Sequence, residues 1–226
     1  MQLEKIHEQL KIYQQNNFRL FTTCSFQSHS LVLLHLISSF DKKIPVYFIN
    51  TGFHFPETLS FRDSVCNLLG IKVMNLFSPT PKSMQKDASG KLLFASDPDY
   101  CCYLNKTLPV EPLLKEFDVW INGVRADQSA ARKSMQVEQA TPFRAVRFHP
   151  MLDWSPKMIH EYAKKYSLPH HPLEEKGYFS IGCEPCTTKV DLSDEGRTGR
   201  WFGLNKTECG LNTDLVSVNE KLKIKI

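Results

Sequence analysis

The chain has 226 residues, of which 42% are hydrophobic and 23% charged, and its formal net charge is +4. This length supports one substantial hydrophobic core, and the mild positive charge suits an anionic ligand without requiring one. No run approaches the about 18 apolar residues that a membrane-spanning helix needs. Residues 1–17 predict an amphipathic helix rather than a signal peptide, so we expect a cytosolic protein.

The first two thirds of the chain alternate between strand-like and helix-like segments. Short apolar runs predict strands at residues 18–24, 44–49, 71–77, 118–121 and 144–148. Helical spacing predicts helices at residues 31–40, 56–69, 99–117 and 156–166. Such alternation is typical of an α/β fold with a parallel, twisted sheet and flanking helices.

The remaining segments are polar or irregular. Residues 80–98 predict a surface loop, and residues 123–142 predict a long loop at the rim of the sheet. The chain becomes irregular after residue 170. We expect one domain over residues 1–200 and a C-terminal segment, 201–226, whose last residues alternate like a strand.

Four of the seven cysteines form two pairs that suggest a metal site. Cys101 and Cys102 are adjacent, and Cys183 and Cys186 form a C-x-x-C pair. Adjacent Cα atoms lie about 3.8 Å apart, below the about 4.4 Å minimum usual for a disulfide. The two pairs offer the four thiolates of an iron–sulfur cluster. Spacing alone leaves two other readings open: a zinc site, or a redox pair beside two buried cysteines.

Six motifs, two of which contain these cysteine pairs, carry a resemblance to a known family and occur in that family's order. They are YFINTGFHFPET at 47–58, CCYLNKTLPVEPL at 101–113, GVRADQSAAR at 123–132, GCEPCT at 182–187, RTGRW at 197–201 and KTECGL at 206–211. With these motifs the chain resembles the sulfonucleotide reductases, specifically the cluster-containing adenylylsulfate (APS) reductases. The resemblance spans residues 18–212 and implies an adenine nucleotide alpha hydrolase-like fold.

The resemblance also implies an activity and a cofactor. The reaction would be the thiol-dependent reduction of APS to sulfite and AMP in assimilatory sulfate reduction. Cys209, in KTECGL, would be the nucleophile and would carry an S-sulfocysteine intermediate. Thioredoxin or a similar dithiol protein would then release sulfite. The two cysteine pairs would hold one [4Fe-4S] cluster per chain, with an electrostatic or positioning role.

Four motif-matched cations are candidates for binding the substrate's negative charge. They are Lys106, Arg125, Arg197 and Arg200. An arginine side chain can bond sulfate and phosphate oxygens at two points. Any single surface cation is more often a solvated charge, and the shared motifs favour the binding role here. Arg132 and Lys133 are weaker candidates for the same role.

The expected phosphate loop departs from the family pattern. Residues 25–30 read SFQSHS and lack the family's glycine-like position and acidic pair. The hydroxyl groups of Ser25, Ser28 and Ser30 can still bind an anion with the backbone N–H groups of the next helix; alternatively they only cap that helix. In the turn after the second strand, Thr51 is a candidate substrate ligand. His54 is either a site residue or a structural hydrogen-bonding residue.

A second departure is Asn212, where the family usually has histidine. Asparagine can donate a hydrogen bond but cannot titrate near neutral pH, so a proton role at this position is in doubt. Cys24, Cys66 and Trp120 lie in apolar patterns and are interpreted as core residues.

Three other functions remain to be separated from APS reduction. The first is reduction of the 3′-phosphorylated nucleotide (PAPS). The second is a zinc-stabilised ATP-binding enzyme that adenylates a substrate or modifies tRNA, for which SFQSHS is a poor pyrophosphate loop. The third is a nucleotide-binding iron–sulfur sensor. We expect no nucleic-acid or membrane partner, and the sequence leaves a homo-oligomer open.

Overall fold

The computed structural model describes residues 1–190, 199–201, 203 and 206–216. Within them, six strands form one sheet in the order β3-β2-β1-β4-β6-β5. The strands are β1 (Leu20–Thr23), β2 (Val46–Ile49), β3 (Val73–Leu76), β4 (Val119–Ile121), β5 (Glu138–Gln139) and β6 (Val146–Phe148). All neighbouring strands are parallel except β5 and β6, which are antiparallel. The predicted parallel α/β fold is confirmed.

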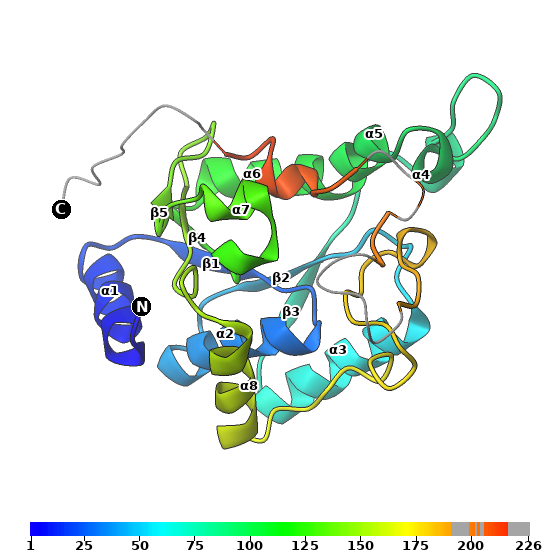
Figure 1. Cartoon of the computed structure of the whole chain (residues 1–226). Helices are drawn as coiled ribbons and strands as arrows, with labels where there is room; N and C mark the ends of the chain where they lie inside the picture. Colours follow the sequence, from blue (N-terminus) through cyan, green and yellow to red (C-terminus); the bar gives the residue numbers. More distant parts are fainter. Residues whose placement is uncertain (191–198, 202, 204–205, 217–226) are drawn as a thin grey trace.

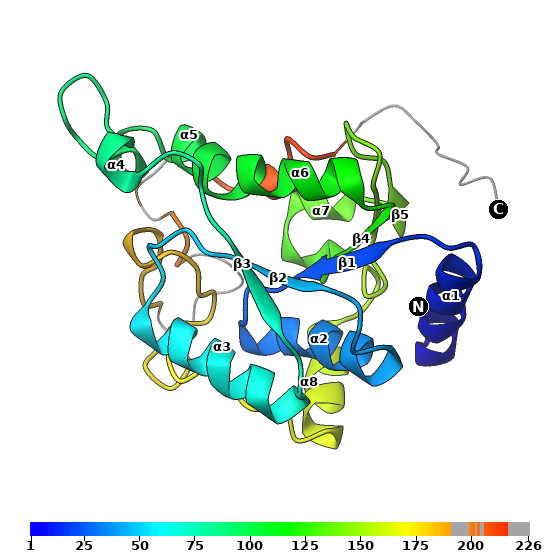
Figure 2. The ribbon, with the colours of Figure 1, turned by 180° about the vertical axis from the view of Figure 1, so that it is seen from behind.

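Helices cover both faces of this sheet. They are α1 (Leu3–Gln15), α2 (Ser28–Phe40), α3 (Pro56–Leu69), α4 (Leu93–Ser96), α5 (Pro98–Cys102), α6 (Leu108–Glu116), α7 (Ala130–Lys133) and α8 (Pro156–Lys165). Figures 1 and 2 show α2, α3 and α8 on one face and α5, α6 and α7 on the other. No helix in the described part of the chain is long and apolar enough to cross a membrane.

The strands are apolar on both faces because both faces are covered. In β1, Leu20 packs into the core beneath α2, whereas its neighbour Phe21 packs into the core beneath α6. In β4, Val119 likewise packs into the core beneath α2, and Trp120 packs into the core beneath α6. Cys24 and Cys66 are buried in the first core, as expected. A side-chain period of two residues thus builds two cores from one sheet.

The strand order places a crevice beside β1. The chain runs from β1 outward to β2 and β3, then returns to β4 on the other side of β1. The loops that follow β1 and β4 therefore diverge at the carboxyl ends of these strands. In parallel sheets this switch point is the usual ligand-binding position.

The helix predicted over residues 99–117 is confirmed in extent, but its middle is not α-helical. After α5 the chain forms a π-helical turn, Tyr103–Thr107, before α6 begins. Pro109 and Pro112 lack the N–H groups that a continuous α-helix would use, so the regular ladder cannot pass through this stretch. π-Helical turns inside helices often occur at functional sites. This one directly follows the cysteine pair and carries Lys106.

Both predicted loops contain short regular elements. Residues 80–98 include α4, and residues 123–142 include α7 and β5. These elements are too short for their periodicity to show in the sequence. The second loop is not confined to the rim, because Arg132 of α7 is buried. The strand-like end of the chain, residues 217–226, lies outside the described residues.

Candidate active site

A cavity of about 220 Å³ opens at the carboxyl ends of β1, β2 and β4. Its walls come from the loops after these strands, from the π-helical turn, from α7 and from the cysteine-bearing loops. Among its lining residues are the predicted site residues Ser25, Ser30, Thr51, Lys106, Cys183, Arg200 and Cys209. The fold thus brings most of the predicted site together at the switch point of the sheet.

The loop after β1, residues 24–30, forms one end of this cavity, which we call the hydroxyl end. Ser30 Oγ donates to the Gln27 carbonyl at 2.7 Å, and Ser25 Oγ lies 3.4 Å from Ser30 Oγ. Phe26 adopts a positive φ of 56° and is fully buried. Its N–H donates to Cys24 Sγ at 3.3 Å. Packing of Phe26 therefore holds a left-handed turn that would otherwise favour glycine.

Ser28 is placed differently from its two neighbours. Its Oγ accepts a 2.7 Å hydrogen bond from the backbone N–H of His171, and it is not among the lining residues. Helix α2 begins at Ser28, and its N-cap residue, Gln27, makes no side-chain cap bond. The structure thus gives no support to the alternative that these serines only cap the helix.

The turn after β2 is held by its own side chains. Thr51 Oγ1 accepts from the Phe53 N–H at 3.2 Å and lies 3.3 Å from Cys183 Sγ. His54 Nε2 lies 3.0 Å from the Ile49 carbonyl, and burial lowers the pKa of His54 to about 4. A neutral imidazole can donate to that carbonyl through Nε2. His54 therefore makes the structural hydrogen bond, and it also lines the cavity.

Three further lining residues are cations, and we call the part of the wall that they form the cationic end: Lys106, Arg132 and Arg200. Burial alone would lower the pKa of Lys106, but the nearby sulfurs of Cys183 and Cys209 raise it above its usual value. The ammonium group therefore stays charged. Lys106 lies on the π-helical turn, which points it between the cysteine pairs and the cavity.

Arg200 is a buried cation with spare hydrogen-bonding capacity. Its guanidinium stacks over the Trp201 ring, 4.7 Å from the centroid, and its Nε has no partner in the described part of the chain. A Cβ on Gly182 would overlap the Arg200 guanidinium, so a larger residue at position 182 would have to displace this side chain. A buried donor without a partner is costly unless a ligand satisfies it.

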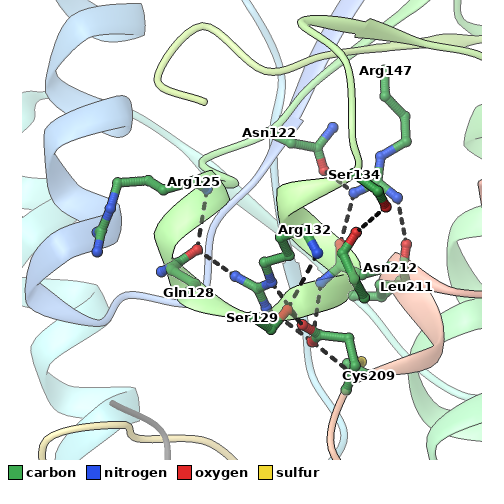
Figure 3. Close-up of polar contacts among 12 residues, drawn as sticks. Asn122, Arg125, Gln128, Ser129, Arg132, Ser134, Arg147, Cys209, Leu211 and Asn212 are labelled. Carbon is green, nitrogen blue, oxygen red and sulfur yellow. Dashed lines mark hydrogen bonds and ion pairs between the residues drawn. The ribbon is translucent and has the colours of Figure 1, made fainter. Parts of the chain in front are cut away.

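Arg125 and Lys133 do not line the cavity. Arg125 pairs with Asp127 through Nε at 2.9 Å and Nη2 at 3.0 Å. Figure 3 shows its side chain pointing away from Arg132. Arg197 lies outside the described residues. Arg132, a weaker candidate in the sequence, does line the cavity.

The four paired cysteines converge on a second, smaller cavity beside Lys106. Cys101, Cys102, Cys183 and Cys186 are all buried. Burial raises the pKa of Cys101 to about 11, and the nearby sulfurs of Cys183 and Cys186 add to this shift. Among the described residues, no three His, Cys, Asp or Glu side chains are placed to hold a single metal ion.

Hydrogen-bond donors surround these sulfurs. Thr51 Oγ1 lies 3.3 Å from Cys183 Sγ, and Asn105 Nδ2 lies 3.6 Å from Cys101 Sγ. Asn105 is fixed by a buried amide pair with Gln85, whose Oε1 accepts from Asn105 Nδ2 at 2.6 Å. Four buried thiols with polar partners on their sulfurs fit the donor set of a Cys₄ iron–sulfur site.

Cys209 lies where the two cavities meet. It is buried, lines the larger cavity and packs with Cys183 and Cys186. A hydrogen bond from the Cys102 thiol, opposed by burial and supported by the Lys106 charge, lowers the pKa of Cys209 well below its usual value. The reactive thiolate form is therefore favoured. If Cys102 is a metal-bound thiolate, it cannot donate, and the cations and the Leu211 N–H remain.

Two residues of this site were missed by sequence reasoning. Glu208 pairs with Arg132 through two bonds of 2.8 and 3.0 Å, and Arg147 donates to the Leu211 carbonyl at 2.6 Å. Figure 3 shows both arginines directed toward the segment that carries Cys209. The sequence could have pointed to Arg147, because a charged residue in a strand predicted to be buried needs a polar partner. Glu208 gave none beyond its place beside Cys209.

Comparison with known proteins places this geometry in a family context. Residues 19–189 match the model of the phosphoadenosine phosphosulfate reductase domain. An adenosine 5′-phosphosulfate reductase of Bacillus cytotoxicus is 38% identical over 204 residues, which cover 88% of this chain and 86% of the relative. One of Rhodococcus erythropolis is 37% identical over 182 residues, covering 80% and 74%. The resemblance stated from the motifs is confirmed.

Solved structures support the fold alone. A phosphoadenylyl-sulfate reductase of Candida auris, in a phosphate complex, aligns with a TM-score of 0.66 at 24% identity. The alignment covers 81% of this chain and 89% of that one. An FMN adenylyltransferase of Candida glabrata aligns with a TM-score of 0.56 at 15% identity, covering 89% and 65%. The architecture is thus shared with adenylyl-transferring enzymes as well as with reductases.

Proposed function

Since the chain belongs to the phosphoadenosine phosphosulfate reductase domain family, we propose that it reduces APS to sulfite and AMP for sulfate assimilation. The relatives at 37–38% identity carry the APS reductase name, which favours APS over PAPS. The observation that carries the proposal is the position of Cys209. This buried thiol borders a cavity at the switch point of the sheet, beside Lys106 and Arg200.

The two ends of the cavity suit the two ends of a sulfonucleotide. The negative charge of APS is concentrated on its sulfate–phosphate anhydride, whereas its adenosine is neutral. The charged portion fits the cationic end, where the Lys106 ammonium and the guanidinium of Arg200, whose Nε has no partner among the described residues, can bind its oxygens. Adenosine then lies beyond the hydroxyl end, where the Ser25 and Ser30 hydroxyl groups of the predicted phosphate loop can bind the phosphate oxygens. This orientation brings the sulfate group to Cys209.

Cys209 performs the first chemical step. Its thiolate attacks the sulfur of the sulfate group, the bond from that sulfur to the phosphate oxygen breaks, and AMP leaves with the bonding electrons. The SO₃⁻ group stays on Cys209 as S-sulfocysteine. Lys106 and Arg200 stabilise the charge that moves onto the leaving phosphate.

A dithiol protein of the thioredoxin type completes the cycle. One of its thiolates attacks Cys209 Sγ, and sulfite leaves with the electrons of the broken S–S bond. The second thiol then displaces Cys209, which is restored while the partner becomes a disulfide. The partner thus supplies the two electrons that reduce the sulfur.

Cys101, Cys102, Cys183 and Cys186 would hold a [4Fe-4S] cluster. Bound there, the cluster would supply electrostatic influence and positioning beside Lys106 rather than electrons. This assignment is supported by the shared cavity of the four thiols and by the donors on their sulfurs. A redox titration in which the cluster cycles at the turnover rate would contradict this role.

An anaerobic absorbance spectrum with iron and zinc analysis tests the cofactor. We expect about four irons per chain, and one zinc in their place would remove the assignment. Steady-state kinetics with APS and PAPS test the substrate. A preference for PAPS of more than about tenfold would overturn the choice of APS. Sulfite formation from neither nucleotide would overturn the reductase function.

A further inference from the structure

The carboxylate of Glu208 accepts hydrogen bonds from α7 and its N-cap residue and from the segment that carries Cys209. It accepts from Arg132 Nε and Nη2 at 2.8 and 3.0 Å, and from Ser129 Oγ at 2.7 Å. It also accepts from the backbone N–H of Cys209 at 2.9 Å and from Asn212 Nδ2 at 3.3 Å. Glu208 and Arg132 are both buried. Bidentate pairs of this kind fix orientation as well as position.

A second arginine holds the other side of the same segment. Arg147, which is completely buried, donates through Nη1 to the Leu211 carbonyl at 2.6 Å and through Nη2 to Asn212 Oδ1 at 2.8 Å. Its guanidinium stacks over the Trp120 ring, 4.7 Å from the centroid. Figure 3 shows Arg147 and Arg132 approaching the segment from different elements, β6 and α7.

Asn212 joins the two anchors. Its amide oxygen accepts from Arg147 while its amide nitrogen donates to Glu208. Residues 208–212 are therefore held at both ends, with Cys209 between them. This task needs hydrogen bonds but no group that titrates. Asparagine can therefore occupy the position where the family usually has histidine.

These contacts change the role of Arg132. Three of its side-chain nitrogens are already committed: Nε and Nη2 to Glu208, and Nη1 to the Gln128 side chain. The Glu208 carboxylate also neutralises its charge. Arg132 thus differs from Arg200, whose Nε has no partner in the described residues. Two of its five N–H groups have no bond among those described, but the adjacent Glu208 carboxylate disfavours an anionic ligand at them.

We propose that Glu208 and Asn212 are positioning residues, which lock Cys209 in its reactive place through Arg132 and Arg147, and that Arg132 is not a substrate ligand. The inference rests on the proposed role of Cys209 as nucleophile. Breaking either anchor releases the thiol segment, so it slows the attack on sulfur and exposes the thiol. Loss of a substrate ligand would instead weaken substrate binding.

The first test measures exposure of Cys209 without any substrate. Iodoacetamide is added to the anaerobic holoenzyme, and the alkylation rate of the Cys209 peptide is followed by mass spectrometry. We expect the rate to rise about tenfold or more in Glu208→Gln, which removes one charge of the buried pair, and in Arg132→Lys, which keeps the charge but loses the two-point contact with the carboxylate. Glu161→Gln and Arg144→Lys change exposed ion pairs and serve as matched controls. Equal rates in all variants would overturn the proposal.

The second test separates positioning from binding. In Arg132→Lys and Glu208→Gln we expect kcat to fall about 100-fold while KM changes less than about threefold. The double variant Arg132→Gln/Glu208→Gln should be no slower than Glu208→Gln, because both changes break one interaction. A KM raised more than about tenfold with kcat retained would make Arg132 a substrate ligand and overturn the proposal.

A milder variant guards against loss of folding. Ser129→Ala removes one hydrogen bond to Glu208 and the N-cap bond to the Arg132 N–H but leaves the ion pair, so we expect alkylation of Cys209 to rise about threefold while the melting temperature falls by only a few degrees. No rise would count against the lock. If the wild-type enzyme reduced neither nucleotide, the proposed function would fail, whereas the alkylation result would still decide whether residues 208–212 are locked.

Discussion

The two ends of the active-site cavity are built from different chemistry. The hydroxyl end consists of the loop after β1 and the first turn of α2, where Ser25 Oγ donates to Ser30 Oγ and Ser30 Oγ donates to the Gln27 carbonyl. The cationic end is assembled from three distant segments that bring Lys106, Arg132 and Arg200 together. One end is neutral and local in sequence, and the other is charged and depends on the tertiary fold.

This difference predicts a separate role for each end of the cavity. Neutral hydroxyl groups can orient a nucleotide at modest energy, on the order of 1 kcal/mol per hydrogen bond. Buried cations act more strongly on charge that moves during a reaction, because little water screens them. We therefore expect changes at the cationic end to act mainly on the chemical step and changes at the hydroxyl end on binding.

The largest effect should come from Cys209→Ser. A serine hydroxyl is not ionised near neutral pH, so sulfite formation from APS should fall below detection. The iron content should stay unchanged, since the cluster cysteines remain. Cys66→Ala, which alters a buried core cysteine, is the control and should retain activity. If Cys209→Ser still produced sulfite, Cys209 would not be the nucleophile. The proposal that the cationic end acts on the chemical step would then also be contradicted.

Lys106→Met should have the next largest effect. The change keeps the length of the side chain but removes the charge beside Cys209, so we expect kcat to fall about 100-fold. The exposed Lys115→Met on α6 is the matched control. Stopped-flow measurement of AMP release separates the attack by Cys209 from the later thiol exchange. A normal rate of AMP release in Lys106→Met would break the contrast between the two ends.

Ser30→Ala should have a smaller effect, and on a different parameter. The loss of one neutral hydroxyl group should raise KM for APS about fivefold and leave kcat near its wild-type value. Ser64→Ala, on the exposed side of α3, controls for the substitution itself. A fall in kcat comparable to that of Lys106→Met would show that the two ends act together on the chemical step.

The smallest effect concerns the stability of the hydroxyl end in acid. His171 Nδ1 accepts from the Leu173 N–H at 3.2 Å, and burial lowers the pKa of His171 to about 4. The unfolded chain then binds more protons than the folded one between about pH 6.5 and pH 4, so stability falls as the pH is lowered through this range. His171→Gln should reduce the acid-induced loss of melting temperature by a few degrees, on the order of 3 °C.

Circular dichroism melts at pH 7 and pH 5 measure this difference. The backbone of His171 donates to Ser28 at the base of the hydroxyl loop, and this contact does not depend on the side chain. An identical pH dependence in wild type and His171→Gln would locate the acid sensitivity elsewhere, for instance at the buried His149, whose pKa burial lowers to about 3.

The sequence predicted the fold and most of the site because both rest on local signals. Alternating apolar segments predicted the parallel sheet, and short motifs marked Lys106, Arg200 and Cys209. The π-helical turn was not predicted, because proline effects on a helix depend on what can pack against the interruption. Arg125 matched its motif as well as Arg200 did, yet its partner is Asp127 rather than the cavity.

What the sequence by itself determined is the set of reactive groups: two cysteine pairs, a further cysteine near the C-terminus, and several cations in recognisable motifs. Only the tertiary structure decided which of these groups meet and which are already engaged. Arg132 and Arg200 both lie in family motifs, Arg132 as the weaker candidate. Glu208 neutralises Arg132, whereas Arg200 keeps its Nε without a partner among the described residues. The physical reason is that charge acts through distance and burial, and both are set by long-range packing.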